Sequence, residues 1–203
     1  ILAVGVYVLN SGNLLRSKPV GVFFNEPLIE QAVRLALGKG AAEQISEQDL
    51  LSISEIFVFG NQPAADEETF YSFLDHFVQN DGTVLRGGIS DLKDLAGLKN
   101  LTRVSICYQN IVDLTPLAEL ANLKTIDVRH NPINDVSPLA GLTSLESLTV
   151  FDTNVSDLTS LHSCSRLASV DAGYTLVRST AAFEGLSSLR TLHVRRAPLQ
   201  SLD

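Results

Sequence analysis

The sequence contains no Trp and no Met, and only thirteen of its 203 residues are aromatic. Antiparallel sandwiches and barrels are usually richer in aromatic and β-branched side chains, so the composition argues against both. Two cysteines are too few for a disulfide framework. A net charge of −8 argues against nucleic acid or an anionic membrane surface as the partner. The chain opens on Ile rather than Met, so we expect it to be part of a longer protein.

Leucine is abundant instead, with thirty-two copies, and it recurs at a fixed period. From Ile89 onward the chain repeats every 22 residues, a period typical of repeat proteins. Apolar residues stand at positions 1, 4, 7, 10, 13, 16 and 18 of each unit, with few exceptions. The five full units, named repeats 1 to 5, are residues 89–110, 111–132, 133–154, 155–176 and 177–198, and a sixth begins at Leu199.

The apolar spacing within each unit predicts its local structure. In repeat 2 the end of the unit carries Leu123, Ile126 and Val128, where the spacing changes from three to two. A spacing of two predicts a short strand, and the preceding spacing of three predicts a helical or 3-10 turn on the opposite side. One unit cannot bury its own apolar side, so the units must stack. The stacked strands then form a parallel sheet with about 5 Å between neighbours, an α/β solenoid.

The 22-residue length and the pattern I-x-D-L-x-P-L-A-x-L resemble the leucine-rich repeats of the bacterial internalin subclass. The resemblance covers residues 89–203 and, more weakly, residues 20–62. It implies a curved solenoid with parallel strands on the concave face, short helical or 3-10 segments on the convex face, and a helical N-terminal cap. It also implies a protein-binding role at the cell surface.

The resemblance further implies an Asn at position 21, whose side chain bonds to the backbone. Other residues stand there in four of the five repeats, so we expect irregular turns after the strands. The column reads Gln109, Asn131, Thr153, Thr175 and Ala197.

Position 3 holds a column of aspartates. An Asp just before a helical turn caps the free N–H groups of that turn. A Ca²⁺ loop would need denser oxygen ligands. We therefore expect capping rather than metal binding from Asp91, Asp113, Asp135 and Asp157.

Residues 20–62 are predicted to form the N-terminal cap with a first, degenerate repeat. Residues 20–24 are apolar and predict a short strand that covers the sheet edge. Asn25 and Pro27 then open a helix that ends at Gly38. The inward face of this helix is predicted to consist of Leu28, Ala32, Leu35 and Ala36.

The degenerate repeat follows a capping box. Ser46 and Asp49 open a helical turn. Repeat positions 10, 13, 16, 18 and 21 are then reproduced by Leu50, Ile53, Ile56, Val58 and Asn61.

Residues 63–88 do not fit the repeat and are predicted to be an irregular insertion. An acidic loop precedes an amphipathic helix over residues 69–80, which we expect to replace a convex segment. Residues 83–86 predict another strand. The inward side of the helix is predicted to carry Phe70, Phe73, Leu74 and Phe77.

Residues 1–19 are predicted to be a membrane-proximal or linker segment. Residues 1–9 are uncharged and apolar, but shorter than the roughly 20 residues that span a bilayer. They also lack the basic flank of a signal peptide. They are either the outer end of a transmembrane helix or an extra strand on the cap, and we favour the first. The repeats would then lie outside the cytoplasm behind a single span, with a signalling domain such as a kinase preceding it.

The sequence has none of the motifs HExxH, GxSxG, GxGxxG or the P-loop. Cys107 and His130 lie on adjacent predicted strands and are a conceivable nucleophile and base, with Asp127 and Asp152 nearby. A sheet face that is open to water stabilises the charge of a transition state poorly. We therefore favour a non-enzymatic chain without cofactor or metal. Cys164 is more than two repeats from Cys107, too far for a disulfide.

Strand positions 15, 17 and 19 are predicted to point to the solvent on the concave face, with position 20 at its rim. Aromatic and Arg side chains there are typical of binding surfaces. The predicted partner is a protein, with a peptide or a surface glycan also open, and the alternative role is a structural spacer in a membrane signalling protein. The predicted binding residues are Arg103, Tyr108, Asp127, Arg129, His130, Phe151, Asp152, Asp171, Tyr174, His193, Arg195 and Arg196. A purely structural alternative for Phe151 is that it stacks on Arg129.

Overall fold

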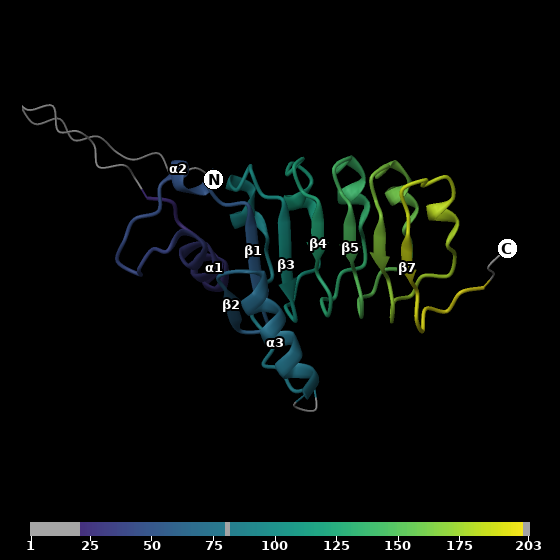
Figure 1. Ribbon diagram of the computed structural model, residues 1–203, viewed down its shortest axis with the longest axis horizontal. Helices are drawn as coiled ribbons and strands as arrows, with labels where there is room; N and C mark the ends of the chain where they lie inside the picture. Colours follow the sequence, from purple (N-terminus) through teal and green to yellow (C-terminus); the bar gives the residue numbers. More distant parts are fainter. Residues whose placement is uncertain (1–20, 80–81, 201–203) are drawn as a thin grey trace, which may run out of the picture.

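The computed structural model describes residues 21–79 and 82–200, so the predictions for residues 1–19 lie outside the described part. Seven strands form one sheet in the order β2-β1-β3-β4-β5-β6-β7, which runs the length of the molecule (Figure 1). All neighbours are parallel except β1 and β2. The strands are β1 (Glu55–Phe59), β2 (Gln62–Ala64), β3 (Arg103–Cys107), β4 (Thr125–Asp127), β5 (Ser147–Thr149), β6 (Ser169–Asp171) and β7 (Thr191–His193).

Short helical segments complete each coil. No helix in the described part of the chain is long and apolar enough to cross a membrane. The α-helices are α1 (Pro27–Leu37), α2 (Glu47–Leu50) and α3 (Glu67–Gln79). The 3-10 segments are η1 (Lys93–Gly97), η2 (Thr115–Leu117), η3 (Ser137–Gly141), η4 (Thr159–Ser163) and η5 (Ala181–Phe183).

The strand register follows the predicted 22-residue period. Ile126 pairs with Leu148 in the next repeat, and both occupy position 16. Ile56 pairs with Val104, so the degenerate repeat stacks on repeat 1 as predicted. The apolar side chains of successive coils form one continuous core between the sheet and the 3-10 segments. This parallel sheet with 3-10 turns on its opposite side is the predicted solenoid.

The aspartates at position 3 cap the 3-10 segments, as predicted. Each accepts a hydrogen bond from the backbone N–H two residues later, and the donors are Lys93, Thr115, Ser137 and Thr159, at 2.7 to 2.8 Å. The hydrogen bond from Thr159 lowers the pKa of Asp157. Repeat 5 has Ser179 at this position, and its hydroxyl accepts from Ala181 N–H at 3.1 Å.

The turns after the strands are regular, so the predicted irregularity is wrong. The residue at position 20 is left-handed in all five repeats, with φ between 52° and 59°, and Gly60 has φ 58° at the equivalent place. Asn131 Nδ2 donates to Ile106 O at 2.9 Å, and Gln109 is long enough to make equivalent backbone bonds. Thr153 Oγ1 donates to Val150 O at 2.7 Å. Different side chains therefore support the same turn.

Helix α1 is positioned differently from the prediction. Its N-cap is Glu26, which makes no side-chain cap bond, and Asn25 instead donates to Asp94. The predicted face is wrong by about one residue: Leu35 and Ala36 are exposed, and the buried residues are Ile29, Ala32 and Val33. The reason is that Glu26 accepts N–H bonds from Ser90 and Asp91, which fixes the start of the helix against repeat 1. Gly38 ends α1 with φ 63°, as predicted.

The described residues at the start of the cap, 21–24, form no strand, contrary to prediction. The edge of the sheet is covered by β2, which turns back from β1 and pairs with it antiparallel. Val22 N–H instead donates to Ile45 O at 2.8 Å beside α2. The capping box of Ser46 and Asp49 is present as predicted.

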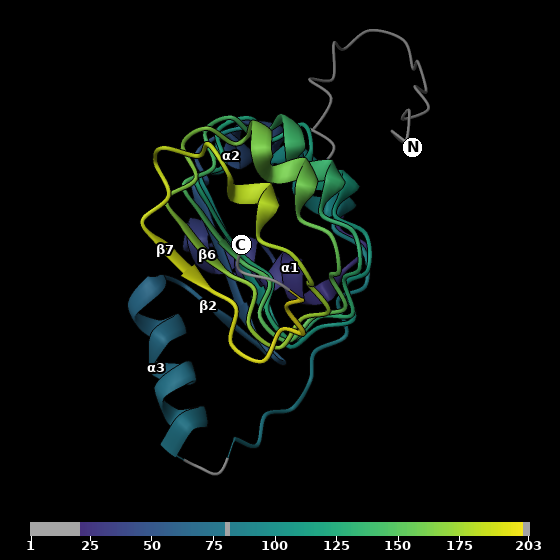
Figure 2. The same cartoon turned by 90° about the vertical axis from the view of Figure 1, so that its right-hand side faces the viewer.

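Helix α3 lies on the side of the sheet opposite the 3-10 segments, so the prediction that it replaces a convex segment is wrong (Figure 2). The reason is in β1, where Phe57 and Phe59 point away from the main core and need a cover. Phe70 of α3 is buried against both rings. Phe73, Leu74 and Phe77 also face this cluster, as predicted.

Residues 83–86 form no strand, also contrary to prediction. This segment returns from α3 and crosses the ends of β1 and β3. Its carbonyl at Leu85 accepts from Asn61 N–H at 3.0 Å, and Gly87 N–H donates to Tyr108 O at 2.9 Å. Two bonds to different neighbours hold the segment across the strands rather than alongside one of them.

Candidate partner-binding face

The sheet face is the side of the sheet that points away from the main core, and it is the predicted concave face. Helix α3 covers its N-terminal end, and the face is open from β4 to β7 (Figures 1 and 2). Arg103 lies under α3 and forms ion pairs with Glu67 and with Glu55. Asp171 is half-buried on the face, and His193 is exposed there.

A line of aromatic side chains crosses the sheet face at the ends of the strands. Tyr108 contacts the Phe59 ring at 5.2 Å between centroids and stacks on His130 at 3.9 Å. His130 meets Phe151 at 5.4 Å, and Phe151 meets Tyr174 at 5.0 Å. Tyr108, His130, Phe151 and Tyr174, here named the aromatic line, thus place one ring in contact with the next in each of four successive repeats.

The backbone holds the aromatic line in register. Tyr108, His130 and Tyr174 occupy the left-handed position 20, and each donates its N–H to the position-19 carbonyl of the next repeat, at 2.7 to 3.2 Å. Phe151 occupies position 19. Its ring lies over Gly173, where an added Cβ would be only 3.0 Å from Phe151 Cδ2. Gly173 therefore leaves the space that Phe151 fills.

Phe151 does not stack on Arg129, contrary to the structural alternative. Arg129 instead pairs with Asp127 of its own repeat, with Nη2 to Oδ2 at 2.6 Å. The Asp127 side chain is only 9% exposed, so this pair is part of the scaffold. Asp127 and Arg129 are thus bound to each other, and the Asp127 side chain has little surface left for a partner.

Cys107 and His130 do not form a nucleophile and base pair in the described structure. Cys107 is buried, its Sγ contacts Asp127 O at 3.7 Å, and burial raises the pKa of its thiol well above the usual value. His130 Nδ1 lies 2.7 Å from Asp152 Oδ2. Burial lowers the pKa of His130 in spite of that carboxylate. Cys164 is also a free, buried thiol, so the predicted absence of a disulfide is confirmed.

The C-terminal end of the aromatic line is cationic. The guanidinium carbons of Arg195 and Arg196 lie 5.6 and 5.2 Å from the centroid of the Tyr174 ring. Both arginines are exposed. Of the predicted binding residues, the structure therefore brings six together in one continuous strip: Tyr108, His130, Phe151, Tyr174, Arg195 and Arg196.

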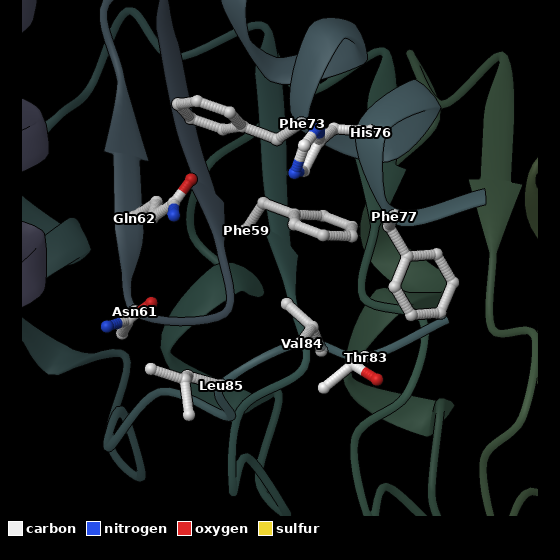
Figure 3. A pocket seen from close by; sticks show the side chains of 9 residues that line it. All are labelled: Phe59, Asn61, Gln62, Phe73, His76, Phe77, Thr83, Val84 and Leu85. Atoms are coloured by element: carbon white, nitrogen blue, oxygen red, sulfur yellow. The ribbon is translucent and has the colours of Figure 1, made fainter. Parts of the chain in front are cut away.

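A pocket of about 240 Å³ lies between α3 and the segment that returns from it (Figure 3). Phe59 forms its floor, Phe73 and Phe77 come from α3, and Val84 and Leu85 line the opposite side. The sequence analysis missed this pocket. The signal was available in β1, where Phe57 and Phe59 take strand positions that are mostly small or polar in the repeats. Within residues 21–79 and 82–200, no group of three His, Cys, Asp or Glu residues could hold a metal ion.

Residues 121–163 match the family described as leucine-rich repeats, two copies. Internalin C2 from Listeria monocytogenes is 22% identical, with a TM-score of 0.51, over 87% of this chain and 96% of that one. Internalin F from the same organism is 23% identical, with a TM-score of 0.53, over 88% of this chain but only 59% of that one. No curated protein sequence matches significantly.

The fold and the repeats define a leucine-rich-repeat solenoid. More particularly, the fold is similar to that of two internalins over most of the length of the chain.

Proposed function

We propose that this chain is a protein-recognition module of a bacterial surface protein, and that its partner binds the sheet face between α3 and the C-terminal end. The observation that carries the proposal is the aromatic line, which ends among exposed arginines on an open face. Solenoids use such extended faces for binding, and clustered Tyr, Phe and Arg are typical of binding hot spots. A spacer needs no such strip.

The surrounding face supports this assignment. Thr149, Ser147 and Ser169 are small and half-buried, so a partner can approach the rings closely. The rings are already fixed by their neighbours, so little side-chain freedom is lost when a partner binds. Internalin C2 and internalin F share the fold, and their names support placing the chain at a bacterial surface.

Site-directed photo-crosslinking tests which face binds. A photoreactive phenylalanine replaces Thr149 on the sheet face or, as the control, exposed Ser165 on the opposite side. We expect an adduct with a labelled extract of surface proteins only from position 149, and its loss when Tyr174→Ala is added but not when Tyr71→Ala is added. Equal adducts from both positions would contradict the proposal, and no adduct from either would favour the spacer.

We further propose that the chain is not an enzyme. Burial of Cys107 and the raised pKa of its thiol support this, because a cysteine nucleophile needs an accessible thiolate. Folded protein treated with iodoacetamide at neutral pH should leave Cys107 unmodified by mass spectrometry, whereas urea-unfolded protein should be fully labelled. Rapid labelling of Cys107 in the folded state would reopen the Cys-His alternative.

A further inference from the structure

Unneutralised positive charge gathers at the C-terminal end of the sheet face. Arg195 and Arg196 follow β7, and the guanidinium groups of both pack against the Tyr174 ring. Within the described residues, neither arginine has a carboxylate in ion-pair contact. Each guanidinium therefore has N–H donors that no described residue accepts.

The two other arginines on the strands of this face are neutralised within the chain, Arg103 by Glu67 and Arg129 by Asp127. His130 lies against Asp152, and burial lowers the pKa of His130, which disfavours its charged form. The strand-borne arginines without a carboxylate partner are therefore those at the C-terminal end of the face.

The chemistry of the two arginines selects the ligand group. Two like charges beside one ring repel each other, and an anion placed between them removes that repulsion. A guanidinium presents paired N–H donors that match the two oxygens of a carboxylate. The Tyr174 and Phe151 rings adjoin this charge at 5.0 Å from each other, so an apolar group beside the anion has a surface to pack on.

The overall charge restricts the length of the anion. The chain carries a net charge of −8, and residues 1–88 hold 5 basic and 11 acidic side chains. A long polyanion that extended toward α3 would meet this acidic half and be repelled, whereas a short acidic stretch would contact only the cationic end.

We propose that the C-terminal end of the sheet face binds a short acidic segment of the partner protein. Its carboxylates bond to Arg195 and Arg196, and an aromatic side chain next to them packs on Tyr174 and Phe151. This inference rests on the proposed function and adds the chemical class of the segment recognised.

Fluorescence polarisation with defined peptides tests the proposal. The probe is a labelled ten-residue peptide in which Glu alternates with Phe, and its matched control has Gln in place of every Glu. The protein variants are Arg195→Ala with Arg196→Ala, the same pair changed to Lys, and a control that loses two exposed arginines elsewhere, Arg166→Ala with Arg178→Ala.

We expect the Glu peptide to bind about two- to thirtyfold more tightly than the Gln peptide, the range that two exposed carboxylate–arginine contacts give. The double Ala variant should lose this preference, the double Lys variant should keep only part of it, and the control should bind as the unchanged protein does. Equal binding of the two peptides overturns the proposal, as does equal loss in the control. If neither peptide binds at concentrations up to about 1 mM, the proposal is also overturned.

A second arm separates this inference from the proposed function. If a labelled sulfated oligosaccharide binds the unchanged protein but not the double Ala variant, while neither peptide binds, the ligand is a glycan and the acidic-segment proposal fails. If crosslinking at position 149 still captures a protein from the double Ala variant, the sheet face remains the binding face and only the preference for acid is wrong.

Discussion

Replacing Gly87 with Ala tests how the insertion is joined to the solenoid. A Cβ at Gly87 would lie 2.0 Å from Gln109 Oε1 and 2.4 Å from Gly60 O. The clash with Gly60 O involves backbone on both sides, so the return segment must shift, and the Gln109 side chain must move as well. Gln109 would then lose the bond from Ile89 N–H at 3.1 Å and its bond to Cys107 O at 3.0 Å.

The expected loss of stability is large. Overpacking costs about 1–3 kcal/mol, and each buried group left without a partner costs about 1–3 kcal/mol. Some relaxation is expected, so we predict that Gly87→Ala lowers the free energy of unfolding by about 3–5 kcal/mol. Urea unfolding followed by circular dichroism measures this directly.

The adjacent glycine provides the control. A Cβ at Gly88 meets nothing within 4 Å, so Gly88→Ala should change the free energy of unfolding by less than about 1 kcal/mol, in the stabilising direction if at all. If the two variants differ by less than about 1 kcal/mol, the return segment is not packed against Gln109 and Gly60 as described. The path of the segment that returns from α3 across the strand ends would then differ from the one described.

Three further predictions concern the coils. Asn131→Ala should lower the free energy of unfolding in urea by about 2–4 kcal/mol, because backbone groups in two repeats lose their hydrogen-bond partner. This loss should be at least twice that of Thr153→Ala, which removes one hydrogen bond. Equal losses would contradict the prediction. Arg129→Ala should lower the free energy of unfolding by about 2–3 kcal/mol, because it leaves the Asp127 carboxylate buried and unpaired. An unchanged melting temperature would contradict the scaffold role of Arg129 and favour a role in partner binding. Because burial lowers the pKa of His130 from 6.5, the unfolded chain binds that proton more readily, and stability should fall as the pH drops through 6.5; His130→Gln should flatten that dependence, and an unflattened curve would exclude His130 as its cause.

The repeat could be predicted from the sequence because its period is imposed by packing. Each coil must place the same positions toward the core, so Ile126, Leu148 and Val170 align in register as their spacing requires. The Asp caps follow from local chemistry within two residues. The open surface could be predicted in part, since strand alternation decides which side chains leave the core.

The position of α3 could not be predicted from periodicity, because residues 63–88 lie outside the repeat. An amphipathic pattern indicates that Phe70 is buried, but not against which side of the sheet. The contacts among rings were also beyond the pattern. They depend on the left-handed turn at position 20 and on the missing side chain of Gly173. An alignment of the repeats by position shows neither the backbone conformation nor the space above a glycine.

The left-handed turn at position 20 lowers the stability of the fold where it carries the rings of the aromatic line. A residue with a Cβ is strained in that conformation by roughly 1–2 kcal/mol compared with glycine, and Gly60 occupies the equivalent place without that strain. Tyr108, His130 and Tyr174 therefore hold their rings on the surface at a conformational cost. Glycine at these positions would relax the backbone of each coil and erase the aromatic line with it. An effort to make this solenoid more heat-resistant by removing backbone strain would thus begin with the residues of the proposed binding strip.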